Sequence, residues 1–251
     1  MPARLPPWQA RPSRDASPRL RRGRPQGGGS GIPGTIVVVP TRNEVGNIGV
    51  LVDALSALGL RALVVDDASP DGTAAMARLH GAEVLERRGA PGLGPAYRDG
   101  FAWALSGGYD TIVQMDADLS HDPADVPRLL AAGADLALGS RYVPGGGTRN
   151  WGWRRRALSR FGSLYAQAWL GVPVADLTGG FKCWRADLLG RVLEQPLVSD
   201  GYAFQVETTL AAHRLGARVA EVPIVFTERT EGRSKMSLAI TVEAALRVPR
   251  F

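Results

Sequence analysis

The sequence is poor in cysteine and in long apolar runs. Its one cysteine, Cys183, cannot form a disulfide within the chain, and no CxxC or Cys/His cluster offers a zinc site. No apolar run approaches the ~20 residues that span a bilayer, and the first residues hold no apolar core of a signal peptide. These absences argue against a secreted scaffold and an integral membrane protein, and they predict a cytosolic or cytosol-facing protein.

Lysine is also scarce, which bears on nucleotide binding. Neither of the two lysines, Lys182 and Lys235, fits the GxxxxGK[ST] pattern of a phosphate-binding loop. The first predicted strand is followed by PTRNE at 40–44, without the glycines of a dinucleotide fingerprint. Both of these nucleotide signatures are therefore disfavoured.

The net charge of +6 is confined to one end of the chain. Residues 1–30 hold seven arginines and a single acid, Asp15, whereas residues 31–251 hold equal numbers of acidic and basic side chains. The same segment is rich in proline and ends in glycines, which predicts a disordered tail over 1–31 and a folded domain over 32–251. The tail is either a solvated extension without function or a segment attracted to anionic lipid headgroups.

With 45% hydrophobic residues, the rest of the chain can bury a core. Short β-branched runs alternate with helical patterns from residue 35 onward. This alternation predicts an α/β fold in a single domain, with a mostly parallel sheet and helices on both faces. Cys183 is expected in the core. The predicted strands lie at 35–39, 62–65, 83–85, 111–115, 136–138 and 219–226.

Acidic side chains follow three of these strands, at the edge where ligands of parallel sheets bind. Like charges are unfavourable together unless a cation neutralises them. Carboxylate oxygens without cysteine favour Mg²⁺ or Mn²⁺ over zinc, so the pattern predicts a site for a metal and a diphosphate. Two other acids, Asp71 and Asp122, are expected to be helix caps or turn formers. The strand-end acids are Glu44, Asp66, Asp67, Asp116 and Asp118.

Short motifs in a consistent order carry a family resemblance. VPTRNE (39–44), VDDASPDGT (65–73), GLGPAY (92–97) and MDADLSH (115–121) resemble the signatures of family 2 glycosyltransferases with the GT-A fold. GSRY (139–142), DLTGGF (176–181), GYAFQVE (201–207), EVPI (221–224) and RTEGRSK (229–235) resemble, more narrowly, those of dolichyl- or polyprenyl-phosphate mannose synthases. The resemblance spans about residues 35–246, and the combination is far more specific than any single motif.

The resemblance implies an inverting transfer of mannose from GDP-mannose to a polyprenyl phosphate of the dolichyl type, assisted by Mg²⁺ or Mn²⁺. Asp118 and Arg141 would be the catalytic residues. The binding residues would be Asp116, Asp118 and Ser120 for the metal; Arg141, Arg155 and Ser159 for the lipid phosphate; and Pro40, Arg42, Glu44, Val65, Asp67, Asp116, Ala117, Asp118, Arg141, Arg229 and Lys235 for the donor.

The chain departs from the family pattern at three of its motif positions. Arg42 stands where the family usually has tyrosine, so a guanidinium would replace a ring in stacking on the base. Ala68 replaces a frequent glycine. Ser120 stands where some relatives place a glutamine near the metal, which leaves its role as a ligand open.

The segment from 149 to 170 has two interpretations. Five arginines and two tryptophans, with no acid, lie between residues 149 and 160. One interpretation is a core helix with a solvated basic start. The other is an amphipathic interfacial helix near 153–170, with tryptophans and arginines at headgroup depth and its apolar side against acyl chains. The apolar positions at helical spacing are Leu158, Phe161, Leu164, Tyr165 and Ala168.

Together these features predict an enzyme attached peripherally to the cytosolic face of a membrane, by its amphipathic segments or by an anchoring protein. A phosphate monoester is largely dianionic at neutral pH and needs no strong general base, so His80, His121 and His213 are expected to be surface or structural residues. One alternative keeps the fold and uses UDP-glucose. The others are a nucleic-acid-binding module, which the neutral domain disfavours, and an inactive regulatory subunit, which the intact acidic and basic set disfavours.

Overall fold

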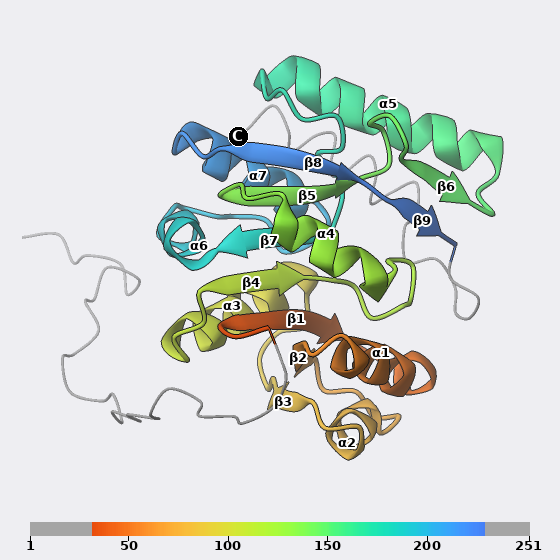
Figure 1. Cartoon of the computed structure of the whole chain (residues 1–251), viewed down its shortest axis with the longest axis vertical. Coiled ribbons are helices and arrows are strands. Elements are labelled where there is room, and N and C mark those ends of the chain that lie inside the picture. The colour runs from red at the N-terminus through yellow and green to blue at the C-terminus, as the bar shows by residue number, and fades with distance from the viewer. Residues whose placement is uncertain (1–31, 229–251) are drawn as a thin grey trace, which may run out of the picture.

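The computed structural model describes residues 32–228, which are built around a seven-stranded sheet (Figure 1). Its strands are β1 (Thr35–Thr41), β2 (Arg61–Asp66), β3 (Glu83–Glu86), β4 (Thr111–Gln114), β5 (Leu136–Ser140), β7 (Lys182–Arg185) and β8 (Val219–Pro223). Their order across the sheet is β3-β2-β1-β4-β7-β5-β8. All run parallel except β7, which is antiparallel to its neighbours β4 and β5. The predicted mostly parallel sheet is confirmed.

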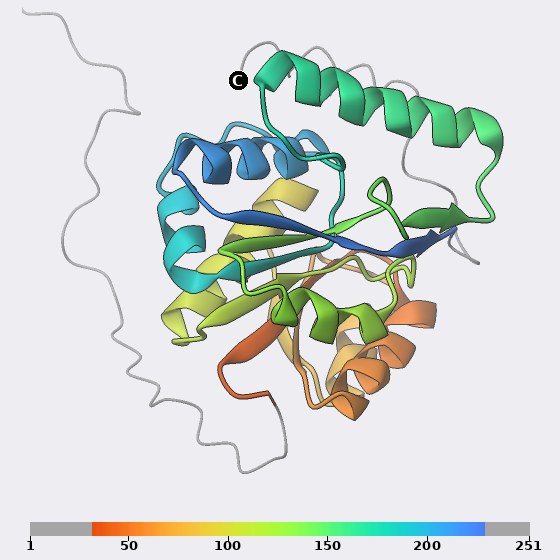
Figure 2. The same cartoon turned by 45° about the horizontal axis from the view of Figure 1, so that its top comes forward.

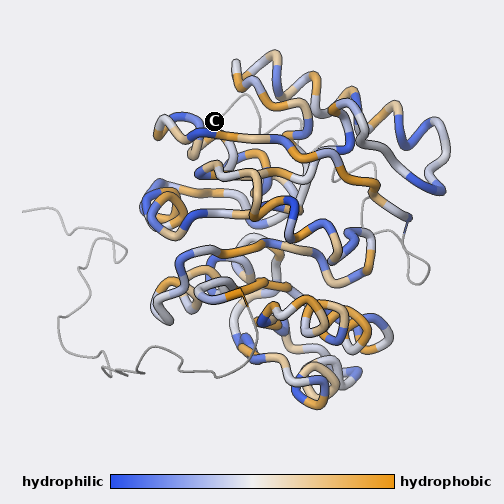
Figure 3. The backbone as a smooth tube through the Cα atoms, in the orientation of Figure 1, coloured by the Kyte–Doolittle hydropathy of each residue, from blue (hydrophilic) through white to orange (hydrophobic). Residues whose placement is uncertain are grey.

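Helices cover both faces of this sheet, as the alternating pattern predicts. They are α1 (Val45–Ala57), α2 (Thr73–Leu79) and α4 (Val126–Ala131) on one face, and α3 (Leu93–Ser106), α6 (Ala186–Leu193) and α7 (Ala203–Arg214) on the other. Val37 of β1 packs with the first group, and Val38 packs with the second. Because both faces are buried, the central strands are hydrophobic along most of their length (Figure 3). Cys183 of β7 is buried in the core between the sheet and helices α1, α2 and α4, as expected.

Two strands differ from the sequence expectation. The short β7 escapes the pattern because its sequence, KCWR, begins and ends with a basic residue. The single strand predicted at 219–226 is wrong, because the chain forms β8 and then β9 (Val225–Thr227), which pairs with β6 (Gly147–Arg149) in a second small sheet. Between them, the Ile224 N–H donates to Ser140 of β5 and the Ile224 carbonyl accepts from Gly147 of β6. The chain therefore passes from one sheet to the other at this residue.

The loops after β1, β2 and β4 share a backbone feature. Asn43, Ala68 and Leu119 have φ angles of 58°, 54° and 58°. Residues other than glycine adopt this left-handed conformation at a cost of about 1–3 kcal/mol. Ala68 thus holds without a glycine the conformation that glycine adopts most readily. These strained turns lie beside the strand-end acids, at the edge of the sheet where ligands are expected.

Helix α5 (Trp153–Leu170) lies apart from the two helical layers (Figure 2). It buries only small residues, Ser159, Ser163 and Ala166. Most of its large apolar residues are exposed instead, whereas Tyr165 and Leu170 are partly buried against the core. The helix therefore packs on the core through one narrow face, while the apolar positions at 158, 161 and 164 do not behave as the core-helix interpretation expects. The exposed residues are Trp153, Leu158, Phe161, Leu164 and Trp169. Within residues 32–228, no helix combines the length and the apolar composition needed to cross a bilayer.

Candidate functional site

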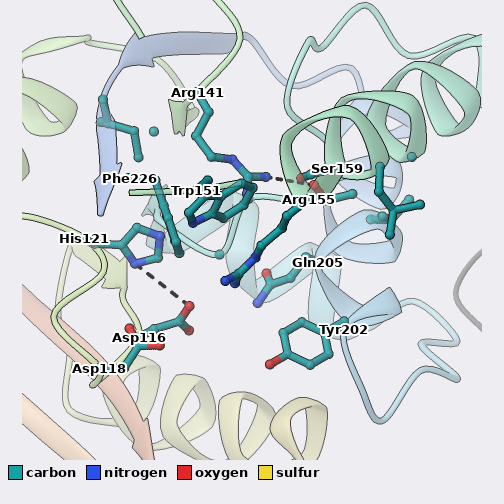
Figure 4. A pocket seen from close by; sticks show the side chains of 18 of the residues that line it. Asp116, Asp118, His121, Arg141, Trp151, Arg155, Ser159, Tyr202, Gln205 and Phe226 are labelled. Atoms are coloured by element: carbon teal, nitrogen blue, oxygen red, sulfur yellow. Dashed lines mark hydrogen bonds and ion pairs between the residues drawn. The ribbon is translucent and has the colours of Figure 1, made fainter. Parts of the chain in front are cut away.

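A cavity lies at the carboxyl edge of the sheet, between the loop after β4 and α5 (Figure 4). Its volume of about 130 Å³ is roughly ten times what one water molecule needs, so part of a larger ligand can enter it. Charged, polar and aromatic side chains from both halves of the sheet line it. They include Asp116, Asp118, His121, Arg141, Trp151, Arg155, Ser159, Gln205 and Phe226.

Asp116 and Asp118 form the acidic side of the cavity. The Tyr97 hydroxyl donates to Asp116 Oδ1 (3.2 Å), and the Ser120 N–H donates to Asp118 Oδ1 (3.1 Å). Burial raises the pKa of Tyr97 well above its ordinary value, and the charge of Asp116 raises it further. The phenol therefore stays protonated and acts as a fixed donor to Asp116.

These two carboxylates fit a hard divalent cation. Mg²⁺ is usually held by one or two carboxylates together with water and substrate phosphates. No group of three His, Cys, Asp or Glu side chains suited to a metal occurs within 32–228. The two carboxylates would therefore share the cation with water or phosphate oxygens. Ser120, the third predicted ligand, is not among the residues that line the cavity. Its hydroxyl is buried and has no hydrogen-bond partner in the described chain.

Arg141 is held in a buried fork with Asp176. Its Nε donates to Asp176 Oδ2 (2.7 Å), and its Nη2 donates to Asp176 Oδ1 (2.6 Å) and to Thr178 Oγ1 (2.9 Å). Burial alone would lower the pKa of Arg141, but the charge of Asp176 raises it above its ordinary value. Conversely, Arg141 holds the pKa of Asp176 below its ordinary value despite burial. Glu221 fixes this fork from behind by accepting from the backbone N–H groups of Ala175 and Asp176.

Arg155 enters the cavity from α5. Its guanidinium lies over the Trp151 ring, 4.4 Å from the centroid, and donates to Glu228. The Ser159 hydroxyl, one turn further along α5, accepts a hydrogen bond from Tyr142 (2.7 Å). The structure thus brings all three predicted acceptor residues, Arg141 included, to the same cavity as the two aspartates.

His121 is buried beside the acidic pair, so it is not a surface residue. It stacks on Phe181 and meets Phe226 edge to face, and its Nδ1 lies 3.9 Å from Asp116 Oδ2. Burial lowers its pKa below the ordinary value, which favours a neutral ring. The Nδ1 atom and the indole nitrogen of Trp151 have no hydrogen-bond partner among the described residues. Buried polar atoms are normally paired, so these two are candidates for a ligand or water.

The predicted donor residues on β1 and β2, and in the loops that follow these strands, lie next to the cavity at the same edge of the sheet. They are not part of the cavity lining. Arg42 donates to the Asp67 carbonyl, and Glu44 accepts from Asn47. The Asp67 carboxylate is engaged by Arg87 and by the Gly92 N–H. The side chains of three other predicted donor residues are not placed to contact a nucleotide. Pro40 lies within β1, and the side chains of Val65 and Ala117 are buried in the two cores. Arg229 and Lys235 lie outside the described residues.

The two acids expected to shape turns do so. Asp122 accepts from the Ala124 N–H at the start of a short 3₁₀ turn (Pro123–Asp125). Asp71 accepts from the N–H and hydroxyl groups of Thr73 at the start of α2. Neither carboxylate lines the cavity.

Lys182 is a fully buried cation behind the site. Its Nζ donates to the Gln205 carbonyl (2.7 Å) and to Thr208 Oγ1 (3.2 Å). Burial lowers the pKa of Lys182 to about 7. The unfolded chain, in which a lysine titrates near 10.4, therefore binds more protons than the folded one between these values. Stability contributed by this group rises with pH across that window.

We expect the Lys182→Met variant to lose this pH dependence. Between pH 7 and 10, the unfolding free energy of the wild type should rise relative to that of the variant by up to about 1.4 kcal/mol per pH unit. The measurement is urea unfolding of both proteins at several pH values. Parallel curves would show that the buried amine does not titrate in this range.

Comparison with known proteins identifies the class. Residues 36–193 match the family described as Glycosyl transferase family 2. An undecaprenyl-phosphate mannosyltransferase of Micrococcus luteus is 46% identical over 227 residues, covering 86% of this chain and 93% of the relative. A polyprenol monophosphomannose synthase of Mycolicibacterium smegmatis is 45% identical over 231 residues, 86% of each chain. The chain belongs to the family 2 glycosyltransferases, and its predicted resemblance to polyprenyl-phosphate mannose synthases is confirmed.

Solved structures of glucosyl-3-phosphoglycerate synthase from M. tuberculosis share the fold. One is 22% identical with a TM-score of 0.62, covering 85% of this chain and 77% of that chain. Another, in complex with Mn²⁺, UDP and phosphoglyceric acid, is 22% identical with a TM-score of 0.64, covering 85% and 75%. At this identity the likeness concerns the fold alone, and it confirms the predicted GT-A architecture.

Sequence reasoning missed several residues of the cavity. Trp151, Gln205 and Phe226 line it, as do Gly179 and Gly180. Gln205 and the two glycines lie within motifs that carry the family resemblance, GYAFQVE and DLTGGF, but their residue types alone do not indicate a role. Their place in the cavity beside Asp116 and Arg155 identifies them as candidate site residues.

Proposed function

We propose that this protein transfers mannose from GDP-mannose to a polyprenyl phosphate and inverts the anomeric carbon. The observation that carries the proposal is the pairing, in one cavity, of two carboxylates with an arginine that enters from α5 (Figure 4). A site for two anions, one of them held through a cation, needs these opposite charges. The names of the two curated relatives, which act on polyprenyl phosphates, support the same acceptor.

Asp116 and Asp118 would hold Mg²⁺ or Mn²⁺ against the donor diphosphate. When bound, such a cation offsets the negative charge that develops on the departing GDP. The nucleoside would lie on the neighbouring rim, where Arg42, Glu44 and Asp67 follow β1 and β2. Pro40, Val65 and Ala117 would contribute mainly backbone, and Arg229 and Lys235 would bind donor phosphates.

Arg155 and Ser159 would receive the acceptor phosphate. Its dianion requires no base, so one of its oxygens attacks the anomeric carbon directly while the bond to the diphosphate breaks and GDP leaves with the electron pair. Arg141 would lie between donor and acceptor and stabilise both anions, in an orientation fixed by Asp176. A single displacement of this kind converts an α-linked donor into a β-linked product.

Competition between two labelled donors tests the proposal. The full chain is incubated with polyprenyl phosphate, Mg²⁺, tritiated GDP-mannose and ¹⁴C-labelled UDP-glucose, and the lipids are extracted into organic solvent. We expect tritium in the organic phase. Carbon-14 in the organic phase instead would support the UDP-glucose alternative. The absence of both labels from that phase would contradict sugar transfer to the lipid.

The exposed face of α5 supports peripheral attachment to a membrane. Trp153 and Phe161 are 73% and 68% exposed, and arginines flank them along the same helix. Aromatic and basic side chains of this kind suit the headgroup region, while leucine and phenylalanine suit acyl chains. The arginine-rich residues 1–30, which lie outside the described part of the chain, would add a salt-sensitive attraction to anionic lipid.

We expect these two contributions to separate across a salt series. The Debye length falls from ~10 Å at 0.1 M to ~3 Å at 1 M salt, so the attraction due to the tail should fade while the apolar contact of α5 persists. In vesicle co-sedimentation, deletion of residues 1–30 should weaken binding at low salt only. Phe161→Glu with Trp169→Glu should remove the binding that persists at high salt. Persistent binding of the double variant at 1 M salt would exclude α5 as the apolar contact, and equal low-salt binding without the tail would exclude the tail.

A further inference from the structure

Gln205, near the start of α7, reaches the cavity through a chain of buried polar groups. The Trp184 indole donates to Gln114 Oε1 (3.2 Å), and Gln114 Nε2 donates to Gln205 Oε1 (2.5 Å). All three residues are at most 2% exposed. They connect β7, β4 and α7 directly behind the cavity wall.

Hydrogen-bond chemistry fixes the direction of this chain. An indole N–H can only donate, so Gln114 must turn its oxygen toward Trp184 and its NH₂ group toward Gln205. Gln205 then offers its own oxygen to Gln114, and its NH₂ group faces the cavity. The hydrogen bond that fixes the Gln205 side chain among residues 32–228 engages its oxygen, and the residue lines the cavity. The amide can therefore present a neutral N–H donor to a ligand in the cavity.

The backbone of Gln205 is equally well fixed. Its carbonyl accepts from Lys182 Nζ (2.7 Å) and from the hydroxyls of Thr208 (3.3 Å) and Thr209 (3.0 Å). A side chain anchored at both ends loses little rotamer freedom when it binds a ligand.

The neighbours of Gln205 define what it can meet. A Cβ added to Gly180 would come within 3.2 Å of Asp116 Oδ2 and 3.4 Å of Gln205 Nε2, so these two polar groups border the same small space. In Figure 4 the Gln205 amide lies beside the guanidinium of Arg155, on the side of the cavity where Asp116 and Tyr202 are drawn. In the proposed reaction, the charged groups of the cavity would meet the donor diphosphate and the acceptor phosphate. The hexose would lie between these anions and present neutral hydroxyls.

We propose that Gln205 recognises a hydroxyl of the transferred hexose through Nε2 and so helps to select the sugar. Gln114 and Trp184 act as positioning residues that prevent the side-chain amide of Gln205 from flipping its oxygen and nitrogen. The assignment rests on the proposed function, because it places the hexose between the donor diphosphate at Asp116 and the acceptor phosphate at Arg155.

Deoxy-sugar nucleotides test this assignment. kcat/KM is measured for GDP-mannose and its 2-, 3-, 4- and 6-deoxy analogues with wild type, Gln205→Leu and Gln114→Leu. A neutral hydrogen bond contributes up to about 1.5 kcal/mol, so the wild type should use one analogue about tenfold less well than GDP-mannose, beyond any loss common to all. Gln205→Leu should use that analogue and GDP-mannose equally well. Gln114→Leu, which removes the anchor and touches no substrate, should also lose the preference.

Gln195→Leu is the matched control, since it makes the same substitution at an exposed glutamine that does not line the cavity. It should keep the preference of the wild type, and melting temperatures check that each variant folds. A uniform loss over all analogues in Gln205→Leu, or an unchanged preference in folded Gln114→Leu, would overturn the role of Gln205 while mannosyl transfer by the wild type stands. Absence of transfer by the wild type would instead contradict the proposed function.

Discussion

Replacing Asp118 by alanine should lower turnover at least about a thousandfold while the protein stays folded, and Asp116→Ala should behave alike. Both carboxylates face the cavity, and the described chain offers no group of three such ligands that could take over. Loss of a metal ligand removes several kcal/mol of charge stabilisation, and each ~1.4 kcal/mol is tenfold in rate. The measurement is the initial rate of mannose incorporation into lipid at saturating GDP-mannose and Mg²⁺, together with the melting temperature.

Asp122→Ala provides the matched control. This exposed acid lies in the same loop and caps a short turn, but it does not reach the cavity. Its loss should cost about 1 kcal/mol of stability and leave turnover unchanged. Near-normal turnover of Asp118→Ala, or full activity in excess chelator, would remove the metal from the mechanism.

Replacing Arg155 by alanine should impair use of the lipid while sparing the donor. A hydrogen bond to a charged partner contributes about 1.5–3 kcal/mol, so kcat/KM for polyprenyl phosphate should fall about 10- to 100-fold. The affinity for GDP-mannose, measured by calorimetry without acceptor, should change little. A water-soluble short-chain polyprenyl phosphate keeps membrane binding out of the comparison.

Two neighbours of Arg155 sharpen this result. Arg154 is exposed and lies over Trp153 instead of Trp151, so Arg154→Ala should behave as the wild type. Glu228→Gln, which removes the carboxylate that pairs with Arg155, should leave acceptor use unchanged or improve it. An equal fall in donor affinity and acceptor use in Arg155→Ala would show that this arginine belongs to the donor site.

The sequence predicts the sheet and its acidic edge because both depend on local patterns. Each parallel strand is a short apolar run, and the residue after it necessarily lies at the common carboxyl edge. The strand pattern alone therefore places the acids at 116 and 118. It does not reveal the antiparallel β7, because the burial of that strand comes from its neighbours β4 and β5 and its own composition is half basic.

Long-range contacts decide the rest of the site. Asp176 meets Arg141 across 35 residues, and Gln205 meets Gln114 across 91. No spacing rule connects such pairs. The exposure of Phe161 is a similar case. Helical periodicity identifies an apolar face but does not say whether that face packs on the protein core or contacts a lipid surface. In each instance tertiary packing gives the role that residue type leaves open.

The anomeric configuration of the lipid product tests the central claim most directly, namely that one cavity brings a lipid phosphate straight onto the anomeric carbon of the donor. The product made from GDP-α-mannose and polyprenyl phosphate is extracted, and its one-bond carbon–proton coupling at the anomeric position is measured by NMR. A single displacement predicts β-mannosyl phosphate. An α-linked product would contradict direct attack, because retention requires a second displacement or a different path.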